Sequence, residues 1–387
     1  MLRSRAGTRI RKRRKREDVI KYVVVGRAGG RRLIIKSHLN SHPSTTSTRH
    51  TTQRLDTTSP PRKMQRHLKE TRGKRTTIRY IKHKLLPRSR PEFEPVYMMQ
   101  STMHAAVLNS GTQIPLLGLG TYKLRTYEEL YKSISAALDA GYRAFDTAAA
   151  YGNEAQLGRV LRELLPKHGL KRSDVFLISK LGPEDHGPRA KEGCLRSLQQ
   201  LGCEYIDLYL VHWPGVADLE PTDPLHAKYR SQSWAILEEL YDSGKIKAIG
   251  VSNYTVSHLL ELLGSCHVPP AVLQMECHPK LVQKQLREVC KEAGVHFQAY
   301  SSLGKGALLE DPEVKDLAGS RGRTPAQVLL RWAVQQGISV LPRSSQPQSV
   351  QENSRIFDFE LSNKEMQRLS DLNCDTRYCT RDSTSIR

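Results

Sequence analysis

Residues 126–146, TYEELYKSISAALDAGYRAFD, contain a complete helix pattern followed by a strand pattern. Thr126 and Glu129 have the spacing of a capping box, in which each side chain bonds the backbone N–H of the other residue. Apolar residues recur every four positions from Leu130 to Leu138, which is typical of one buried helix face, and a glycine follows the last turn. The short apolar run at 144–146 then predicts a buried strand. This stretch is therefore one helix-to-strand step of an α/β fold.

The same alternation of apolar runs and amphipathic stretches continues to residue 341. A later helix is predicted over 325–336, with Thr324 as its N-cap and Gly337 at its stop. Eight βα units in about 250 residues fit a (β/α)₈ barrel, although periodicity alone leaves a doubly wound open sheet as the rival. No GxGxxG follows any strand, which argues against a Rossmann dinucleotide site. The predicted strands are 116–120, 144–146, 175–180, 206–211, 248–252, 272–276, 296–300 and 339–341.

Two further elements are predicted at the edges of this barrel. Turn residues at 109–112 separate two short extended pieces within 107–115, which predicts a β-hairpin ahead of the first strand. A capping box from Ser362 to Glu365 predicts a last helix that packs outside the barrel. We therefore assign residues 104–387 to a single α/β barrel domain with a short N-terminal hairpin.

The positive charge of the chain is concentrated in its first quarter. Residues 1–97 contain 28 Lys and Arg against 6 Asp and Glu, whereas the remaining 290 residues contain 33 of each sign. Basic clusters such as RIRKRRKR at 9–16 alternate with Ser/Thr-rich sequence at 43–58. Such a composition buries too little apolar surface to offset chain entropy, so residues 1–103 are predicted to be a basic, disordered extension.

Three interpretations of this extension stay open. A basic octamer is typical of a nuclear or nucleic-acid-binding signal, and an Arg-rich, acid-poor start is typical of a transit peptide. The favoured third interpretation is a dispensable tail or an upstream extension of the gene model, with Met98, Met99 or Met103 as the start. Because the rest of the chain is neutral, we expect no nucleic-acid binding by the barrel.

Cysteine usage and hydropathy limit the compartment and the class of site. All seven cysteines lie in the neutral part, at wide spacings and without a CxxC pair. Zinc sites and a disulfide framework are therefore both poorly supported, and a reducing, cytoplasmic compartment is the simplest expectation. No apolar run approaches the ~20 residues of a membrane span, and the basic start lacks the apolar region of a secretory signal. We expect a monomer without a metal or a membrane partner.

Four chemically different side chains stand at or after the ends of neighbouring predicted strands. Asp146 ends the second strand, Tyr151 follows on its loop, Lys180 ends the third strand and His212 ends the fourth. Barrel chemistry gathers at the C-terminal ends of the strands, so these side chains are expected at one mouth. The ammonium of Lys180 is expected to lower the pKa of the nearby Tyr151 phenol from ~10, and the Asp146 carboxylate is expected to hold that ammonium in place. A neutral imidazole at His212 can orient a substrate oxygen. The set predicts a proton donor aimed at an oxygen that becomes negative.

Each of these residues alone also has an ordinary structural explanation. Asp146 could cap a helix, and Tyr151 could be a half-buried tyrosine of the barrel rim. Lys180 could be a surface charge, and His212 could be a core histidine with satisfied hydrogen bonds. Four such residues in register at strand ends favour the catalytic interpretation.

The motifs around these residues resemble those of the aldo-keto reductase family, from residue 107 to residue 375 and in the family's order. The resemblance implies a (β/α)₈ barrel whose catalytic tetrad is Asp146, Tyr151, Lys180 and His212. It implies reduction of aldehydes and ketones to alcohols by NADPH, with NADH as a possible substitute and Tyr151 as the proton donor. The matching stretches are 141–148 with Tyr151, Asn153, Glu154 and Gly158, then 205–214, 250–254, Gln274, 299–301 with Leu303, 341–344 and 352–353.

The resemblance also implies which residues hold the cofactor. One group would contact the nicotinamide, a second would flank the pyrophosphate, and a third would hold the adenosine end with its 2′-phosphate. Stacking and amide hydrogen bonds would then fix which face of the nicotinamide transfers hydride. The implied contacts are Ser252, Asn253 and Gln274 on the nicotinamide amide, Tyr300 on its ring, Ser301 and Leu303 beside the pyrophosphate, and Arg343, Ser344, Glu352 and Asn353 at the adenosine end.

Three positions depart from the family pattern. Arg343 stands where Lys is usual, so the charge that would hold a 2′-phosphate is kept. Ser349 stands where many members have an Arg that stacks on adenine, which weakens the case for NADPH over NADH. Ser302 stands where Pro is usual, with no evident chemical cost. His212 is retained where relatives that reduce steroid double bonds carry Glu, which favours carbonyl reduction.

Candidate substrate contacts are Tyr122, His212 and Trp213. Tyr122 and Trp213 could instead be residues that only pack against the barrel. The tail after Asp375 is short, which predicts a fairly open pocket. Small aldehydes, dicarbonyls and prostaglandin- or quinone-type carbonyls would fit, and relatives with similar tails include prostaglandin F synthases and glyoxal reductases. A non-catalytic, NADPH-binding subunit that resembles potassium-channel β subunits stays open as the alternative.

Overall fold

The computed structural model describes residues 25–28, 31–34 and 104–387 of the chain. Strands β1 (Val25–Ala28) and β2 (Arg31–Ile34) form a local antiparallel pair, in which Val25 lies opposite Ile34. This pair departs from the disorder predicted for residues 1–103. The rest of that prediction lies outside the described residues.

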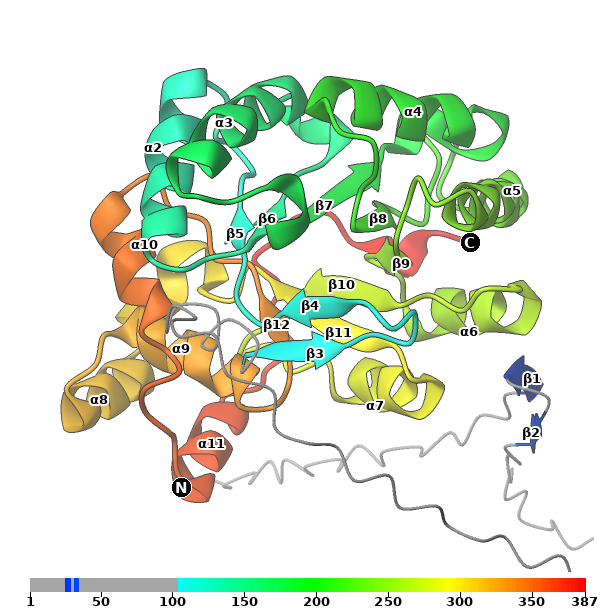
Figure 1. The fold of residues 1–387 in the computed structure, drawn as a ribbon. Helices are drawn as coiled ribbons and strands as arrows, with labels where there is room; N and C mark the ends of the chain where they lie inside the picture. The colour runs from blue at the N-terminus through cyan, green and yellow to red at the C-terminus, as the bar shows by residue number, and fades with distance from the viewer. Residues whose placement is uncertain (1–24, 29–30, 35–103) are drawn as a thin grey trace, which may run out of the picture. The chain divides into compact units, whose positions relative to one another are not determined.

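Eight parallel strands form one sheet whose order follows the chain from β5 to β12 (Figure 1). Hydrogen bonds also join the last strand to the segment just before the first strand. The N–H of Gly118 donates to the carbonyl of Val340 at 2.9 Å, and the N–H of Val340 donates to the carbonyl of Leu116 at 2.8 Å. The sheet is therefore closed into the predicted barrel and is not an open, doubly wound sheet. Its strands are β5 (Leu119–Gly120), β6 (Ala144–Asp146), β7 (Phe176–Leu181), β8 (Leu208–Val211), β9 (Ile249–Ser252), β10 (Val272–Glu276), β11 (His296–Tyr300) and β12 (Ser339–Val340).

Strands β6, β10 and β11 have the predicted bounds, and the other five differ from them by one to three residues. β7 runs one residue past Lys180, so that lysine is the last residue but one of its strand. β8 ends at Val211, and His212 lies just beyond the strand, where its N–H still donates to the carbonyl of Leu181 at 3.2 Å. Both side chains therefore stay at the C-terminal edge of the sheet.

Helices lie outside the strands and cover the barrel (Figure 1). The capping box at the start of α2 is present, because Thr126 Oγ1 accepts from the N–H of Glu129 at 3.2 Å and Glu129 Oε2 accepts from the N–H of Thr126 at 3.1 Å. A Cβ at Gly158 would lie 2.2 Å from the carbonyl oxygen of Leu201, so this glycine allows the close approach of α3 to α4. The helices are α2 (Tyr127–Asp139), α3 (Glu154–Lys167), α4 (Ala190–Leu201), α5 (Leu225–Asp242), α6 (Val256–Ser265), α7 (Lys284–Ala293), α8 (Pro312–Arg321), α9 (Pro325–Val334), α10 (Pro347–Ser354) and α11 (Asn363–Ser370).

The predicted hairpin is formed by β3 (Ala105–Val107) and β4 (Gln113–Pro115), which pair antiparallel. Leu108 and Ile114 are buried and belong to the same apolar cluster as Phe176, the first residue of β7. The hairpin therefore covers the N-terminal end of the barrel and leaves the C-terminal end of the strands for chemistry. Within the described residues, no helix combines the length and the apolar character needed to cross a membrane.

Candidate active site

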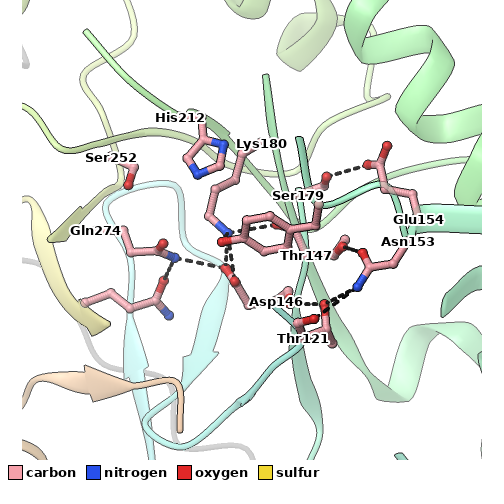
Figure 2. A network of polar contacts seen from close by, with 12 residues as sticks. Thr121, Asp146, Thr147, Asn153, Glu154, Ser179, Lys180, His212, Ser252 and Gln274 are labelled. Carbon is pink, nitrogen blue, oxygen red and sulfur yellow. Dashed lines mark hydrogen bonds and ion pairs between the residues drawn. The ribbon is translucent and has the colours of Figure 1, made fainter. Parts of the chain in front are cut away.

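The four predicted catalytic side chains meet at the C-terminal ends of β6, β7 and β8. Figure 2 labels three of them, Asp146, Lys180 and His212. Lys180 Nζ lies 2.7 Å from each carboxylate oxygen of Asp146, 2.8 Å from the carbonyl oxygen of Thr147 and 3.2 Å from the hydroxyl of Tyr151. The side chain of Lys180 is 0% exposed and that of Asp146 is 5% exposed. A buried ammonium of this kind is stable only when its partners are close and well placed, and here they are.

Tyr151 is held by its ring as well as by its hydroxyl. The tyrosine ends the 3₁₀ turn Ala149–Tyr151, and its ring centroid lies 5.6 Å from that of His212 in an edge-on arrangement. The ring of Tyr122 lies 5.1 Å away on another side. Two of the other three predicted catalytic side chains, Lys180 and His212, therefore contact the phenol.

The predicted lowering of the Tyr151 pKa is wrong for this structure. Burial, followed by the negative charge of Asp146, raises the pKa of the phenol well above its usual value near 10. Burial also lowers the pKa of the Lys180 ammonium, against the opposing effect of Asp146. The phenol therefore keeps its proton at neutral pH. Lys180 is placed to stabilise a phenolate only once that proton leaves.

His212 is neutral at physiological pH, as the sequence interpretation required. Burial, followed by the positive charges of Lys180 and Arg381, lowers the pKa of the imidazole to about 3. Its Nδ1 is buried and has no hydrogen-bond partner among the described residues. A neutral imidazole next to the Tyr151 phenol can form a hydrogen bond to a substrate oxygen without adding charge.

Asn153 is a structural part of the site, and its place in a motif had predicted no particular contact for it. Its side-chain amide donates to the carbonyls of Leu124 at 2.7 Å and Thr121 at 3.0 Å, and its Oδ1 accepts from Thr147 Oγ1 at 2.6 Å. Thr121 Oγ1 in turn donates to the carbonyl of Asp146 at 2.9 Å. These bonds tie the loop after β5 to the loop that carries Tyr151 (Figure 2).

Glu154 is a second buried partner that sequence reasoning missed. Its Oε1 accepts from Ser179 Oγ at 2.6 Å and its Oε2 accepts from Ser197 Oγ at 3.3 Å. Burial raises the pKa of this carboxyl, while the two serine hydroxyls oppose that shift. Because Ser179 directly precedes Lys180 in β7, the bond fixes the strand at the point that carries the ammonium.

The residues implied for the nicotinamide lie beside these catalytic side chains. Asn253, which follows β9, has a φ of 63° and donates from Nδ2 to the carbonyl of His212 at 2.9 Å, while Tyr300 donates to its Oδ1 at 2.7 Å. Gln274 donates from Nε2 to Asp146 Oδ2 at 2.9 Å and to Gln298 Oε1 at 2.8 Å. Ser252 and Gln274 lie together on one side of Asp146, Lys180 and His212 in Figure 2. Gln298 had no sequence signal apart from its place in a buried strand.

The residues implied for the adenosine end lie after β12 and on α10. Arg343 is exposed there, and Ser344 follows it. Asn353 is 3% exposed, and its Oδ1 has no hydrogen-bond partner among the described residues. A buried acceptor without a partner can accept from an amino group, and an exposed guanidinium can bind a phosphate, so both side chains suit the role that the resemblance implies for them. Glu352 is already bonded, since its Oε1 accepts from Thr324 Oγ1 at 2.7 Å.

The candidate substrate and pyrophosphate residues lie around the same mouth. Tyr122 is 53% exposed, and Trp213 is half-buried directly after His212. Ser301 has a φ of 52°, and its Oγ lies 3.4 Å from Cys379 Sγ. The short C-terminal tail therefore reaches the mouth, which the prediction of an open pocket did not foresee.

Comparisons with known proteins agree with this geometry. Residues 116–373 match the model of the Aldo/keto reductase family. The chain is 40% identical over 281 residues to a glyoxal reductase of Bacillus subtilis, which covers 72% of this chain and 96% of that protein. It is 39% identical over 273 residues to the uncharacterized oxidoreductase YtbE of the same organism, and this alignment covers 70% of this chain and 94% of YtbE. A crystal structure of MGS-M4, an aldo-keto reductase from a deep-sea metagenome, superposes with a TM-score of 0.67 at 31% identity. The superposition covers 73% of this chain and 99% of the MGS-M4 chain.

Proposed function

The chain belongs to the aldo/keto reductase family of oxidoreductases, and on this premise we propose that it reduces aldehydes and ketones to alcohols with NADPH. One observation carries the proposal. A protonated phenol, Tyr151, contacts a buried ammonium, Lys180, that is itself held by Asp146. This arrangement suits a group that must hold a proton until an oxygen close to it becomes negative.

The reduced nicotinamide, when bound, supplies hydride to the carbonyl carbon. The chain supplies the proton, because the Tyr151 O–H donates to the carbonyl oxygen as negative charge grows there. Lys180, 3.2 Å from that hydroxyl, stabilises the phenolate that is left. His212 orients the same oxygen as a neutral hydrogen-bond partner. Ser252, Asn253, Gln274 and Tyr300 would hold the nicotinamide beside this group.

We expect the pH profile of kcat/KM to be flat from about pH 5 to about pH 7 with an aldehyde substrate. His212 has a pKa of about 3, so it stays neutral throughout, and the raised pKa of Tyr151 keeps its proton in place. The measurement is steady-state reduction across this range at constant ionic strength. A loss of rate toward acid with a midpoint near the ordinary histidine value of ~6.5 would contradict the neutral role of His212.

Arg343→Met is expected to raise the KM for NADPH by about 10-fold and to leave the KM for NADH nearly unchanged, because a charge-assisted bond to phosphate contributes ~1.5 kcal/mol or more. Arg343 is exposed, so the variant should fold normally. Arg343→Lys is the matched control and should keep most of the preference, since it keeps the charge. Equal losses with both cofactors would mean that Arg343 does not contact the 2′-phosphate.

The test of the proposed function is a carbonyl panel with the full chain, NADPH and NADH. Methylglyoxal, 4-nitrobenzaldehyde and a quinone sample the dicarbonyl, aldehyde and quinone classes. We expect loss of reduced cofactor with at least one of them and formation of the matching alcohol. Cofactor binding without any turnover would instead support the non-catalytic, cofactor-binding subunit.

A further inference from the structure

Three polar side chains lie next to one another in the barrel, one on each of the strands β9, β10 and β11. Ser252 and Gln298 are both register partners of Gln274, which lies between them. The exposed fraction is 1% for Ser252, 2% for Gln274 and 1% for Gln298. Because a buried polar side chain is stable only when its hydrogen bonds are made, its partners decide how it is oriented.

The side-chain amide of Gln274 is oriented by its two acceptors. Its Nε2 donates to Asp146 Oδ2 at 2.9 Å and to Gln298 Oε1 at 2.8 Å, which uses both of its N–H groups. The Asp146 carboxylate, held by the Lys180 ammonium at 2.7 Å, can only accept, so the nitrogen of Gln274 and not its oxygen must face it. No residue of 25–28, 31–34 or 104–387 donates to Gln274 Oε1, so this acceptor stays available.

Asp146 and Gln298 have different effects on this amide. Asp146 decides which end of the amide faces the carboxylate. With that bond alone, the plane of the amide could still turn about it. The second bond runs to an acceptor on β11, away from Asp146 on β6, and two directional bonds from one nitrogen fix the plane. Gln298 therefore determines where the free Oε1 of Gln274 points.

We propose that Gln298 is a positioning residue for the cofactor, which holds Gln274 Oε1 in place as the acceptor for the NH₂ group of the nicotinamide carboxamide. The inference rests on the proposed NADPH-dependent reduction. Ser252 supplies the complementary donor, because its Oγ accepts from Asn253 Nδ2 at 3.1 Å and keeps its own O–H for the carboxamide oxygen. A donor and an acceptor at neighbouring register positions match a primary amide, which offers one of each.

The experiment compares two oxidised cofactors that differ in this NH₂ group. 3-Acetylpyridine adenine dinucleotide phosphate carries a methyl group where NADP⁺ carries the carboxamide NH₂. We measure the Kd of each for the full chain by quenching of intrinsic tryptophan fluorescence, and take the ratio of the analogue to NADP⁺. The ratio cancels the contacts at the adenosine end and any general loss of folded protein. The wild type should bind NADP⁺ more tightly, since the analogue leaves Gln274 Oε1 without a donor.

In Gln298→Met, which has a similar length and no amide oxygen, we expect this ratio to fall by about 5-fold, because the oriented acceptor is lost. Gln298→Glu keeps an oxygen opposite Gln274 Nε2 and should retain most of the wild-type ratio. Gln274→Met should lose the discrimination by itself, and adding Gln298→Met to it should change the ratio no further.

Gln335→Met is the matched control for the loss of a glutamine amide. Gln335 Nε2 donates to the carbonyl of Leu361 at 2.7 Å, and neither residue is among the proposed cofactor contacts. Its ratio should equal that of the wild type. A wild-type ratio near one, an unchanged ratio in Gln298→Met, or the same fall in Gln335→Met would overturn the proposal. If the wild-type chain bound neither dinucleotide, the proposed function itself would have failed, and this inference with it.

Discussion

Tyr151→Phe is expected to lower kcat for carbonyl reduction by roughly 1,000-fold, within the range that a positioned general acid contributes. Phenylalanine keeps the ring that packs edge-on against His212 and removes the hydroxyl that Lys180 contacts at 3.2 Å. The raised pKa of the phenol means that the proton is present at neutral pH, so its loss removes the acid itself. Steady-state kinetics give kcat, and titration of intrinsic fluorescence with NADPH should show nearly unchanged binding.

Tyr131→Phe is the control for this prediction because it deletes a hydroxyl in a similar contact. Tyr131 on α2 also has its hydroxyl 3.2 Å from a lysine ammonium, that of Lys167, but this pair lies at the surface. We expect kcat to stay within about twofold of the wild type, since an exposed contact of this kind contributes little. Retention of more than a tenth of the activity by Tyr151→Phe would exclude the phenol as the main proton donor.

The fold could be predicted because its signals are local and repeat along the chain. The capping box at Thr126 and the four-residue spacing of α2 both fix an element from neighbouring residues alone. Closure of the barrel was not predictable in this way, because it depends on bonds between Leu116, Gly118 and Val340, which are far apart in the sequence. Only the count of eight βα units pointed to it.

The positions of the site residues could be predicted from the ends of the strands, whereas the pKa values of these residues could not. The sequence places Tyr151 and Lys180 on consecutive units but says nothing about how much water reaches them. Burial decides the direction of the phenol pKa here, and burial is a property of the packed barrel. Glu276, the last residue of β10, accepts hydrogen bonds from the backbone N–H groups of Tyr378 and Cys379. These bonds could not be predicted from the sequence for the same reason. A carboxylate at the end of a buried strand was the one signal available.

Lys180→Met is the second change with a large expected effect, and it should affect both activity and stability. We expect kcat to fall by at least 100-fold, because the phenolate of Tyr151 loses its stabilising ammonium. We also expect the free energy of unfolding to fall by about 3–5 kcal/mol, because the Asp146 carboxylate is left buried without its ion-pair partner. Urea denaturation at pH 7 measures the second effect independently of the first.

The double variant Asp146→Asn/Lys180→Met separates the two roles of the lysine. Removing the buried carboxylate as well should restore most of the lost unfolding free energy, because no unpaired charge is left in the barrel. Activity should stay low, since neither change returns an ammonium to the Tyr151 hydroxyl. Lys167→Met, which breaks the surface pair with Glu163 at 2.8 Å, should cost less than about 1 kcal/mol. If the double variant regained activity together with stability, Lys180 would act by holding the fold and not by stabilising the phenolate.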